Sequence, residues 1–434
     1  MYDLIIKNGA VVLPHEVKTV DIGIQGGRIV ALSSSLQTQG STTVYNAENC
    51  YIFPGVIDAH VHLNEPGREH WEGFTTGSQM LAAGGCTTYF DMPLNSIPAT
   101  ITESAFHEKK KVGSKKSIND FRLWGGLVPG NLSQLRSLHN LGAIGFKAFL
   151  SPSGTDEFSH TDDQTLLEGM REIAHLDSVL ALHAESTPII EYLERNVNIE
   201  DPVQAYTQMR PIIAESEAVK RSLSFAELTG CALHFVHISN TSTLRLIQEA
   251  KQQGLNVTVE TCPHYLLFNE HAMYEQGVYA KCAPPLRSEE HRQQLVQALL
   301  DGQIDFVASD HSPSPNTLKQ TGNFLNAWGG INGGQFTLLS LLELTETTSL
   351  TFPDVAQLTA TAPAKRFQLD SDRGSIEEGT LADLVIVSCN NDDVVTKETL
   401  HSKHKDSLYL GHLFPHRIEE TFYRGTSIYK NNRP

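Results

Sequence analysis

Short apolar runs alternate with helical patterns through the middle of the chain, after Pro54-Gly55. The helical patterns, in which apolar residues recur every three to four positions, include residues 165–175, 215–228 and 243–253, the last ending before Gly254 as a C-terminal cap. The apolar runs predict strands at residues 56–63, 86–92, 122–128, 145–150, 179–185, 232–239, 256–262 and 305–310. Eight strand–helix units over about 300 residues predict an α/β fold, a (β/α)8 or TIM barrel.

The alternative fold for this pattern is a doubly wound open sheet. Such a sheet concentrates its binding site at one switch point in the strand order. In this chain, residue types that take part in chemistry follow one apolar run after another, as they do at the C-terminal rim of a barrel. This distribution favours the barrel.

The first fifty residues have the pattern of strands and tight turns. Asn8-Gly9 lies between the apolar runs 4–7 and 10–13 and predicts a hairpin. A glycine-containing turn between residues 20–24 and 28–32 predicts a second hairpin.

The C-terminal part returns to this strand pattern, with runs at residues 384–387, 420–423 and 427–429. We therefore predict a small β-sandwich domain formed by residues 1–54 together with 366–434. Residues 55–365 are expected to form the barrel domain.

Composition excludes several classes of partner. The formal net charge of −17 and the absence of a long basic face argue against nucleic-acid binding, and the run 109–111 of three lysines is expected to be a solvated helix face. No uninterrupted apolar stretch is long enough for a membrane span, and the N-terminal residues lack the features of a signal peptide. Six scattered cysteines without a CxxC pair indicate free thiols in a reducing cytoplasm.

Histidines dominate the residues that could carry chemistry. His60 and His62 lie two apart on a predicted strand, so both side chains point to one face and could hold one divalent ion. Other polar residues also lie at or near the ends of apolar runs: Lys147, His183, His237, His264 and Asp310. Because the strand ends of a barrel meet at one rim, these side chains could converge on a metal site.

Lys147 is unusual because it lies inside the apolar run 144–150. One interpretation is a lysine whose stem is buried while its ammonium reaches water. The other starts from burial, which lowers the pKa of an ammonium group and frees the amine. A free amine can add carbon dioxide and form a carbamate, whose two oxygens could bridge two cations.

His183, His237 and Asp310 each have a structural alternative. Either histidine alone could be a hydrogen-bonded structural residue, and Asp310 could cap a helix. Taken together with the histidine pair and the lysine, they predict a two-metal hydrolase. Asp310 would hold one metal and carry the proton from the attacking water to the leaving nitrogen of an amide-like C–N bond.

Several motifs resemble the cyclic amidases of the amidohydrolase superfamily, which include dihydroorotases, hydantoinases and allantoinases. They are PGVIDAHVHLNEPG at the first barrel strand, GFKAF around Lys147, ASDHSP around Asp310 and GSIEEGTLADLV near the C-terminus. The resemblance covers essentially the whole chain. It implies a barrel with a small β-sandwich, a homotetramer and a carboxylated Lys147 that bridges two divalent ions. It implies zinc, cobalt, iron or manganese, held by His60, His62 and Asp310 on one side and by His183 and His237 on the other.

The substrate is predicted from departures within this family. Asn64 stands where dihydroorotases typically have an arginine that binds a carboxylate, so a neutral ring fits better. The sequence MPLN at residues 92–95, with residues 68–73 and 327–331, resembles the allantoinase branch. That resemblance implies hydrolysis of the ring amide of allantoin, a small neutral cyclic ureide, to allantoate in purine catabolism. A dihydroorotase, a broad hydantoinase and a catalytically silent scaffold are the alternatives.

Five further residues are weaker candidates for binding the substrate. Asn95 could bond the ureido arm or simply form a turn, and His264 could face the substrate or be structural. The others would offer backbone groups to the ring, and they are Cys282, Ala283 and Gly330.

Overall fold

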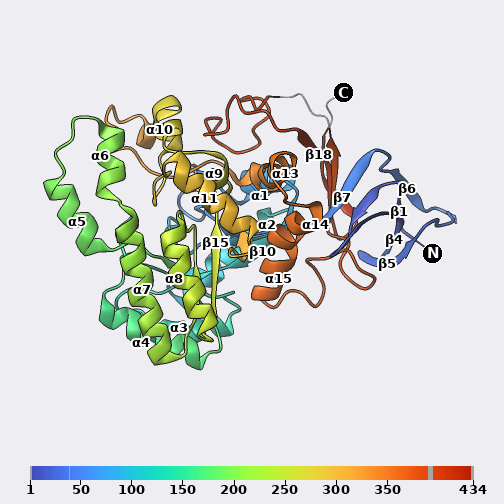
Figure 1. Cartoon of the computed structure of the whole chain (residues 1–434). Coiled ribbons are helices and arrows are strands. Elements are labelled where there is room, and N and C mark those ends of the chain that lie inside the picture. Colours follow the sequence, from blue (N-terminus) through green and yellow to red (C-terminus); the bar gives the residue numbers. More distant parts are fainter. Residues whose placement is uncertain (1, 39, 390–393, 432–434) are drawn as a thin grey trace.

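Eight parallel strand positions form a barrel whose outer face is covered by helices, and a β-sandwich lies beside it (Figure 1). The computed structural model describes residues 2–38, 40–389 and 394–431. The barrel strands are β8 (Val56–Val61), β9 (Cys86–Asp91), β10 (Asp120–Leu123) with β11 (Gly125–Gly126), β12 (Phe146–Phe149), β13 (Val179–His183), β14 (Ala232–Phe235), β15 (Val257–Thr261) and β16 (Phe306–Val307). The eight predicted strands are therefore all present, and the TIM barrel is confirmed.

The barrel wall consists of two runs of parallel pairing, β8 to β10 and β11 to β16. The third strand is interrupted at Trp124, whose indole Nε1 donates to Ala59 O at 3.0 Å across the barrel interior. The wall closes near β16, where His62 N donates to His311 O at 2.8 Å and Val61 forms a parallel bridge with His311. The eighth strand is shorter than predicted because the chain beyond it bonds to the side chain of Asp58 through Ser309 N.

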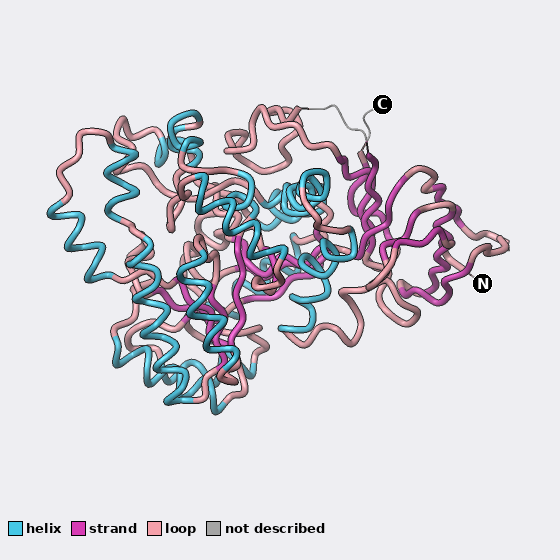
Figure 2. The backbone as a smooth tube through the Cα atoms, viewed as in Figure 1, coloured by secondary structure: helices cyan, strands magenta, loops and turns pink. Residues whose placement is uncertain are grey.

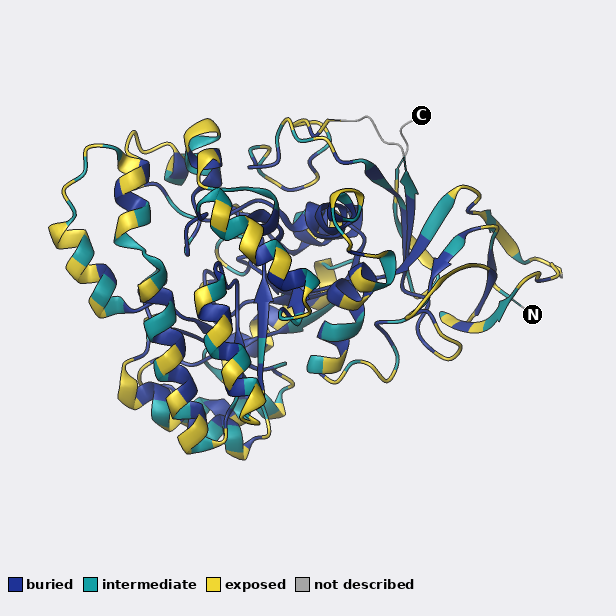
Figure 3. Ribbon diagram, in the orientation of Figure 1, coloured by how far each residue is buried: buried dark blue, intermediate teal, exposed yellow. Residues whose placement is uncertain are grey.

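Helices fill most of the connections between barrel strands and bury one face against the wall (Figures 2 and 3). In α4, for example, Asp162 accepts a hydrogen bond from Thr165 N as the N-cap, and Leu166 and Ile173 are among the buried residues. The main covering helices are α1 (Phe74–Ala83), α2 (Glu103–Lys116), α3 (Leu135–Asn140), α4 (Asp163–His175), α7 (Ile212–Thr229), α8 (Thr241–Gln252), α11 (Glu289–Leu300) and α13 (Thr337–Thr347). Their amphipathic faces confirm the helical periodicity predicted from the sequence.

Further helices, most of them short, lie in the connections at the rim and after the last barrel strand. They are α5 (Thr187–Asn196), α6 (Pro202–Met209), α9 (Pro263–Leu267), α10 (His271–Glu275), α12 (Asn316–Lys319), α14 (Phe352–Ala356) and α15 (Ala362–Arg366). A π-helical turn, Gln357–Thr361, precedes α15. Three 3-10 turns, Leu132–Gln134, Gly277–Ala280 and Gly334–Phe336, complete the helical elements of the described chain.

Aromatic side chains fill the barrel interior and close one end of it. Phe367, directly after α15, packs edge-on against Phe90 and Trp124, with ring centroids 4.9 and 5.4 Å away. Phe306 also contacts the Phe367 ring, at 6.1 Å. Because this end is filled, the opposite end, where the strands terminate, is left for a site.

The sandwich consists of two sheets with strands from both ends of the sequence. The smaller sheet has the order β5-β4-β1-β6 and the larger the order β19-β18-β17-β7-β2-β3. The N-terminal strands are β1 (Leu4–Lys7), β2 (Ala10–Val12), β3 (Val17–Thr19), β4 (Asp21–Gln25), β5 (Arg28–Ser33), β6 (Thr43–Asn46) and β7 (Cys50–Pro54), and the C-terminal ones are β17 (Leu384–Cys389), β18 (His416–Tyr423) and β19 (Thr426–Lys430). Strand β7 leads through Gly55 alone into β8, and Ile52 within it pairs with Ile386 of β17.

The prediction of a hairpin at Asn8-Gly9 is wrong. Strand β1 pairs with β4 and β6, whereas β2 pairs with β3 and β7, so the Asn8 turn carries the chain from one sheet to the other. A local turn signal does not show which strands pair, because both flanking strands here bury apolar side chains in the core between the sheets. The second predicted hairpin, β4 with β5, is confirmed.

The predicted solvated face at residues 109–111 is also partly wrong. Lys109 of α2 is fully buried, and its Nζ lies 2.7 Å from Asp91 Oδ2 and donates to Met92 O at 2.8 Å. Lys110 and Lys111 are exposed, as expected. The buried lysine is explained by its partner Asp91, at the end of β9.

Two further expectations concern the whole chain. All six cysteines are free thiols. Within the described residues, none of the helices combines the length and the hydropathy that crossing a bilayer would require. The boundaries 1–54 with 366–434 and 55–365 stay a prediction, and residues 1, 39, 390–393 and 432–434 of the smaller part lie outside the described residues.

Candidate metal centre

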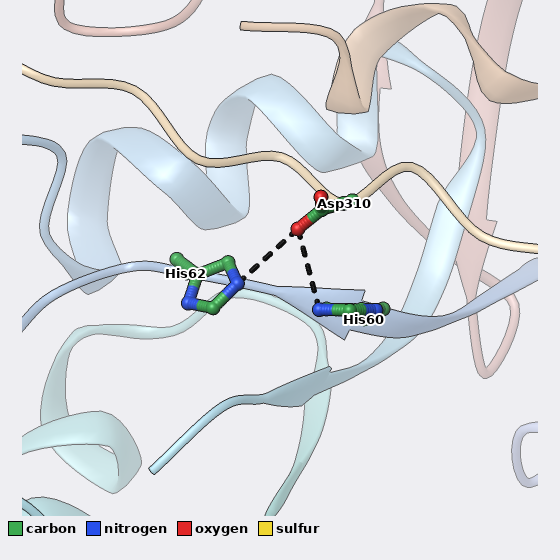
Figure 4. Close-up of side chains that lie close together, drawn as sticks. All are labelled: His60, His62 and Asp310. Carbon is green, nitrogen blue, oxygen red and sulfur yellow. Dashed lines mark ion pairs between the residues drawn. The ribbon is translucent and has the colours of Figure 1, made fainter. Parts of the chain in front are cut away.

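His60, His62 and Asp310 converge at the open end of the barrel (Figure 4). The Nε2 atoms of both histidines lie 3.2 Å from Asp310 Oδ1. One potential ligand atom from each residue lies within 4.8 Å of the others. Two imidazoles and one carboxylate oxygen at this spacing are a donor set suited to a divalent ion.

The backbone turns sharply where two of the predicted site residues leave their strands. His237, just after β14, has φ +41°, and Asp310, after β16, has φ +46°. Residues other than glycine rarely adopt this left-handed conformation, and it concentrates at functional sites. The turns bring both side chains to the cavity that lies at the rim.

A buried carboxylate orients His60. Its Nδ1 donates to Glu260 Oε1 at 2.6 Å, and the second oxygen of Glu260 accepts from His234 Nε2 at 3.0 Å. Burial lowers the pKa of His60, which favours a neutral ring. With the proton on Nδ1, the lone pair of Nε2 faces Asp310 and the proposed metal position.

In the second pair of histidines, the ring nitrogens of His183 have the reverse roles: Nε2, not Nδ1, bonds the carboxylate. His183 Nδ1 and His237 Nε2 lie 3.0 Å apart, while His183 Nε2 donates to Glu185 Oε2 at 2.8 Å. Glu185 is itself bound by Arg210 Nη1 at 2.5 Å. Burial raises the pKa of Glu185, but the opposing effect of Arg210 and then of His183 lowers it to about 2, so the carboxylate stays charged. His183 therefore presents Nδ1, not Nε2, towards its partner.

Lys147 lies in the middle of β12 and is completely buried. Its Nζ has no hydrogen-bond partner among the described residues, and it lies 5.1 Å from the centroid of the Phe149 ring. Burial lowers the pKa of Lys147 to about 8. The alternative of a lysine whose ammonium reaches water is wrong, because the Lys147 side chain is 0% exposed.

A cavity of about 420 Å³ opens onto this group. Its lining includes five of the six predicted metal ligands and four of the five predicted substrate contacts. These are His60, His62, His183, His237 and Asp310, with Asn95, Cys282, Ala283 and Gly330. Lys147 lies behind the lining, and so does His264, which is 1% exposed and has both ring nitrogens without a partner among the described residues.

The structure bears on what was expected of Asn64, Asn95 and Cys282. Asn64 is buried and is not part of the cavity lining among the described residues. The argument from an arginine at this position therefore concerns a side chain that does not line the cavity. Asn95 does line the cavity, and its backbone carbonyl accepts from Arg68 Nη1 at 2.9 Å. Burial raises the pKa of Cys282 to about 12, which leaves its thiol protonated and unsuited to nucleophilic attack.

Sequence reasoning missed the carboxylates that orient the histidines. Glu260 lies inside β15, where a fully buried glutamate is an available signal, because acidic residues are rarely buried unpaired. Glu185 follows His183 by two residues. Arg210, which lies between α6 and α7 and lines the cavity, had no comparable signal in the sequence.

Comparisons with known proteins point to one family. The model of the amidohydrolase family matches residues 51–403. An allantoinase of Bacillus velezensis is 50% identical over 99% of this chain and 94% of its own length, and one of Deinococcus radiodurans is 44% identical over 99% and 96%. Among solved structures, an L-hydantoinase (dihydropyrimidinase) of Arthrobacter aurescens superposes with a TM-score of 0.96 at 32% identity, covering 99% of this chain and 96% of that one.

Proposed function

The chain belongs to the amidohydrolase family, and we propose that it is a metal-dependent cyclic amidohydrolase that hydrolyses the ring amide of allantoin to allantoate. One observation carries this proposal: the chain matches curated allantoinases over nearly its whole length. Five of its six predicted metal ligands line one cavity, which supports the proposal. The hydantoinase-like fold is also compatible with a hydantoinase, which is the second candidate.

The residues at the rim fit a pair of divalent ions. The donor set combines imidazole nitrogens with a carboxylate, and the amine of Lys147 is buried with no partner among the described residues. We propose that His60, His62 and Asp310 hold one ion and that His183 and His237 hold the other. Lys147, carboxylated by carbon dioxide, would bridge them. Zinc is the metal we expect, with cobalt, iron or manganese as alternatives. When bound, such a pair acidifies a shared water and polarises a carbonyl oxygen.

Asp310 is the residue we assign to proton transfer. Both histidine contacts fall on its Oδ1, which leaves Oδ2 outside those two contacts. The carboxylate accepts the proton of the attacking water and delivers it to the ring nitrogen as the C–N bond breaks. The carbonyl carbon becomes the carboxylate of the product, so the reaction adds one water and needs no other reactant.

The remaining lining supports a neutral ring as substrate. Asn95 offers an amide, and Cys282, Ala283 and Gly330 offer backbone groups. The two cationic side chains in the lining are already engaged, since Arg210 pairs with Glu185 and Lys281 donates to backbone carbonyls. Neither ammonium nor guanidinium is therefore fully available to neutralise a substrate carboxylate.

The test is turnover of three substrates by the purified holoenzyme. We expect kcat/KM for allantoin to exceed that for unsubstituted hydantoin and for dihydroorotate. Hydrolysis of hydantoin with no detectable turnover of allantoin would establish the second candidate instead. Inactivity on all three, with no metal bound after reconstitution, would indicate a silent scaffold. Metal analysis of the same sample gives the number and identity of the ions.

Three further proposals complete this assignment. We propose that the enzyme is a homotetramer, which light scattering on the purified protein tests, and that it works in the cytoplasm, in keeping with its six free thiols. We also propose that residues 1–54 with 366–434, and residues 55–365, are the two domains. Hydrogen exchange that protects the two sets of residues separately would support that division.

A further inference from the structure

One wall of the cavity is made by an irregular segment that follows α12. We call residues 320–330 the wall segment. It contributes five residues to the cavity lining, and these are Leu325, Asn326, Trp328, Gly329 and Gly330. The described wall segment contains no helix or strand. A turn, in which Asn326 N and Ala327 N donate to Asn323 O at 3.2 Å, and the bond from Trp328 N to Leu318 O at 2.9 Å fix part of its backbone, and other contacts hold its remaining carbonyls.

Lys281 provides the first set of those contacts. It is only 4% exposed, and its Nζ donates to Phe324 O, Leu325 O and Ala327 O at 2.8, 2.8 and 2.7 Å. The ammonium also lies 4.8 Å from the centroid of the Tyr206 ring. All three N–H groups of the ammonium therefore point at carbonyls of one four-residue stretch, 324–327.

Lys319, the last residue of α12, provides the second set. It is also 4% exposed, and its Nζ donates to Trp328 O at 3.2 Å and to Gly330 O at 2.9 Å, with Val278 O at 3.5 Å. The backbone reinforces this arrangement, since Gly330 N donates to Lys281 O at 2.7 Å. Two buried ammonium groups thus take five carbonyls of the wall segment between them.

Such a pair of lysines is costly to bury. Neither ammonium forms an ion pair with a described carboxylate, so the backbone carbonyls replace water without neutralising the charge. Burial lowers the pKa of Lys281 to about 8, with Arg210 adding to the effect, and lowers that of Lys319 to about 7, with Lys281 adding to it. A buried cation that could be replaced by an apolar side chain at lower cost points to a role beyond packing.

We propose that Lys281 and Lys319 are positioning residues, which hold the wall segment in the conformation that binds the substrate. By donating hydrogen bonds to the carbonyls of the wall segment, the two lysines hold its backbone so that Trp328 and Gly330 line the cavity. The effect on substrate binding rests on the proposed function, whereas the role of the two lysines in holding the wall segment does not. It concerns binding rather than the chemical step, because neither lysine contacts His60, His62 or Asp310.

The first experiment compares Lys281→Met and Lys319→Met with the wild type. Methionine keeps most of the apolar stem and removes the donors. We expect KM for allantoin to rise about tenfold or more while kcat changes less than about threefold, because the wall segment would bind the ground state and the transition state equally well. The matched control is Lys220→Met, which removes an exposed lysine from α7 and should leave both constants unchanged.

Hydrogen exchange provides the second readout and does not depend on the substrate. We expect the amides of Trp328 and Gly330 to exchange faster in both variants, while β8 and β12 keep their protection. If the protein proves inactive on allantoin but the wall segment loosens as expected, the proposed function fails and the positioning role stands. Unchanged exchange in the wall segment together with an unchanged KM would overturn the positioning role.

The wild-type enzyme offers a third readout, should the variants fail to fold. An ammonium group that loses its proton loses its charge and one donor, and this occurs as the pH rises through the pKa. The groups that face the two lysines are Tyr206, Arg210, Cys282 and Phe324, together with the lysines themselves. We expect KM to increase between pH 7 and 9. The rate of hydrogen exchange in the wall segment, corrected for the intrinsic pH dependence of exchange, should rise over the same range. Constant KM and constant corrected exchange over this range would contradict the proposal.

Discussion

The buried pair of Lys109 and Asp91 allows a quantitative prediction of stability. Both side chains are essentially inaccessible to solvent, with Nζ 2.7 Å from Oδ2, and Asp91 Oδ1 also accepts from Leu63 N, next to His62. Replacing Lys109 by methionine leaves a buried carboxylate without its cation. Removing one partner of a buried pair costs about 3–5 kcal/mol. At about 2.1 cal/mol/K per residue the unfolding entropy of this chain is about 0.9 kcal/mol/K, so Tm should fall by about 3–5 °C.

Thermal unfolding followed by circular dichroism measures this shift. Lys111→Met is the matched control, because it removes an exposed lysine from the same run in α2 and should change Tm by less than about 1 °C. The double variant Asp91→Asn with Lys109→Met should recover part of the loss, because its buried amide carries no charge. A Lys109→Met protein as stable as the Lys111→Met protein would refute the assignment of Lys109 as the internal partner of Asp91.

Four further predictions concern the metal centre. Lys147→Ala should abolish turnover and reduce the bound metal, and full activity in that variant would contradict the bridging role. Burial lowers the pKa of Lys147 to about 8, so the fraction of Lys147 in the free amine form rises about tenfold per pH unit up to pH 8. The rate of Lys147 carboxylation in metal-free enzyme, measured by mass spectrometry at a fixed concentration of dissolved carbon dioxide, should therefore rise with pH and level off above about pH 8. Asp310→Asn should lower kcat by about 10²–10⁴-fold, and a steady-state rate near wild type would exclude proton transfer by this residue. Glu260→Gln should weaken metal binding by about 10–100-fold in a chelator competition assay, whereas Gln297→Glu on the exposed face of α11 should not.

The barrel could be predicted from the sequence because its signals are local and repeated. Each buried strand is a short apolar run, and each covering helix has its own periodicity, so the prediction does not depend on knowing the contacts between them. The ends of these strands must meet at one rim, which is why His60, Lys147 and Asp310 could be assigned to one site before any distance was known.

The parts that were wrong depend on long-range contacts. Asn8-Gly9 has the chemistry of a hairpin turn, but the pairing of β1 with β4 and β6 is decided by the packing of the two sheets. Lys109 resembles its neighbours in the sequence, and only the position of Asp91 on another element makes it internal.

The site shows the same division. The metal-ligand candidates are recognisable residue types at strand ends, whereas the contacts of Lys281 and Lys319 are carbonyls, which every residue possesses. No residue type in the wall segment therefore indicates that two lysines hold it. The burial of Asn64 outside the cavity lining likewise could not be predicted from its identity, because it depends on a turn in which Asn64 has φ +64°.

The direct passage from β7 through Gly55 into β8 has a consequence for biosynthesis. Strand β8, which carries His60, directly follows β7 in the sequence. In β7, Ile52 pairs with Ile386 of β17, which is translated near the end of the chain. At about 5–20 residues per second, the ribosome needs tens of seconds to bridge that interval. Throughout it, the edge of β7 that will pair with β17 stays unpaired, so the larger sheet of the sandwich is completed only near the end of synthesis, a stage at which chaperones would engage the chain.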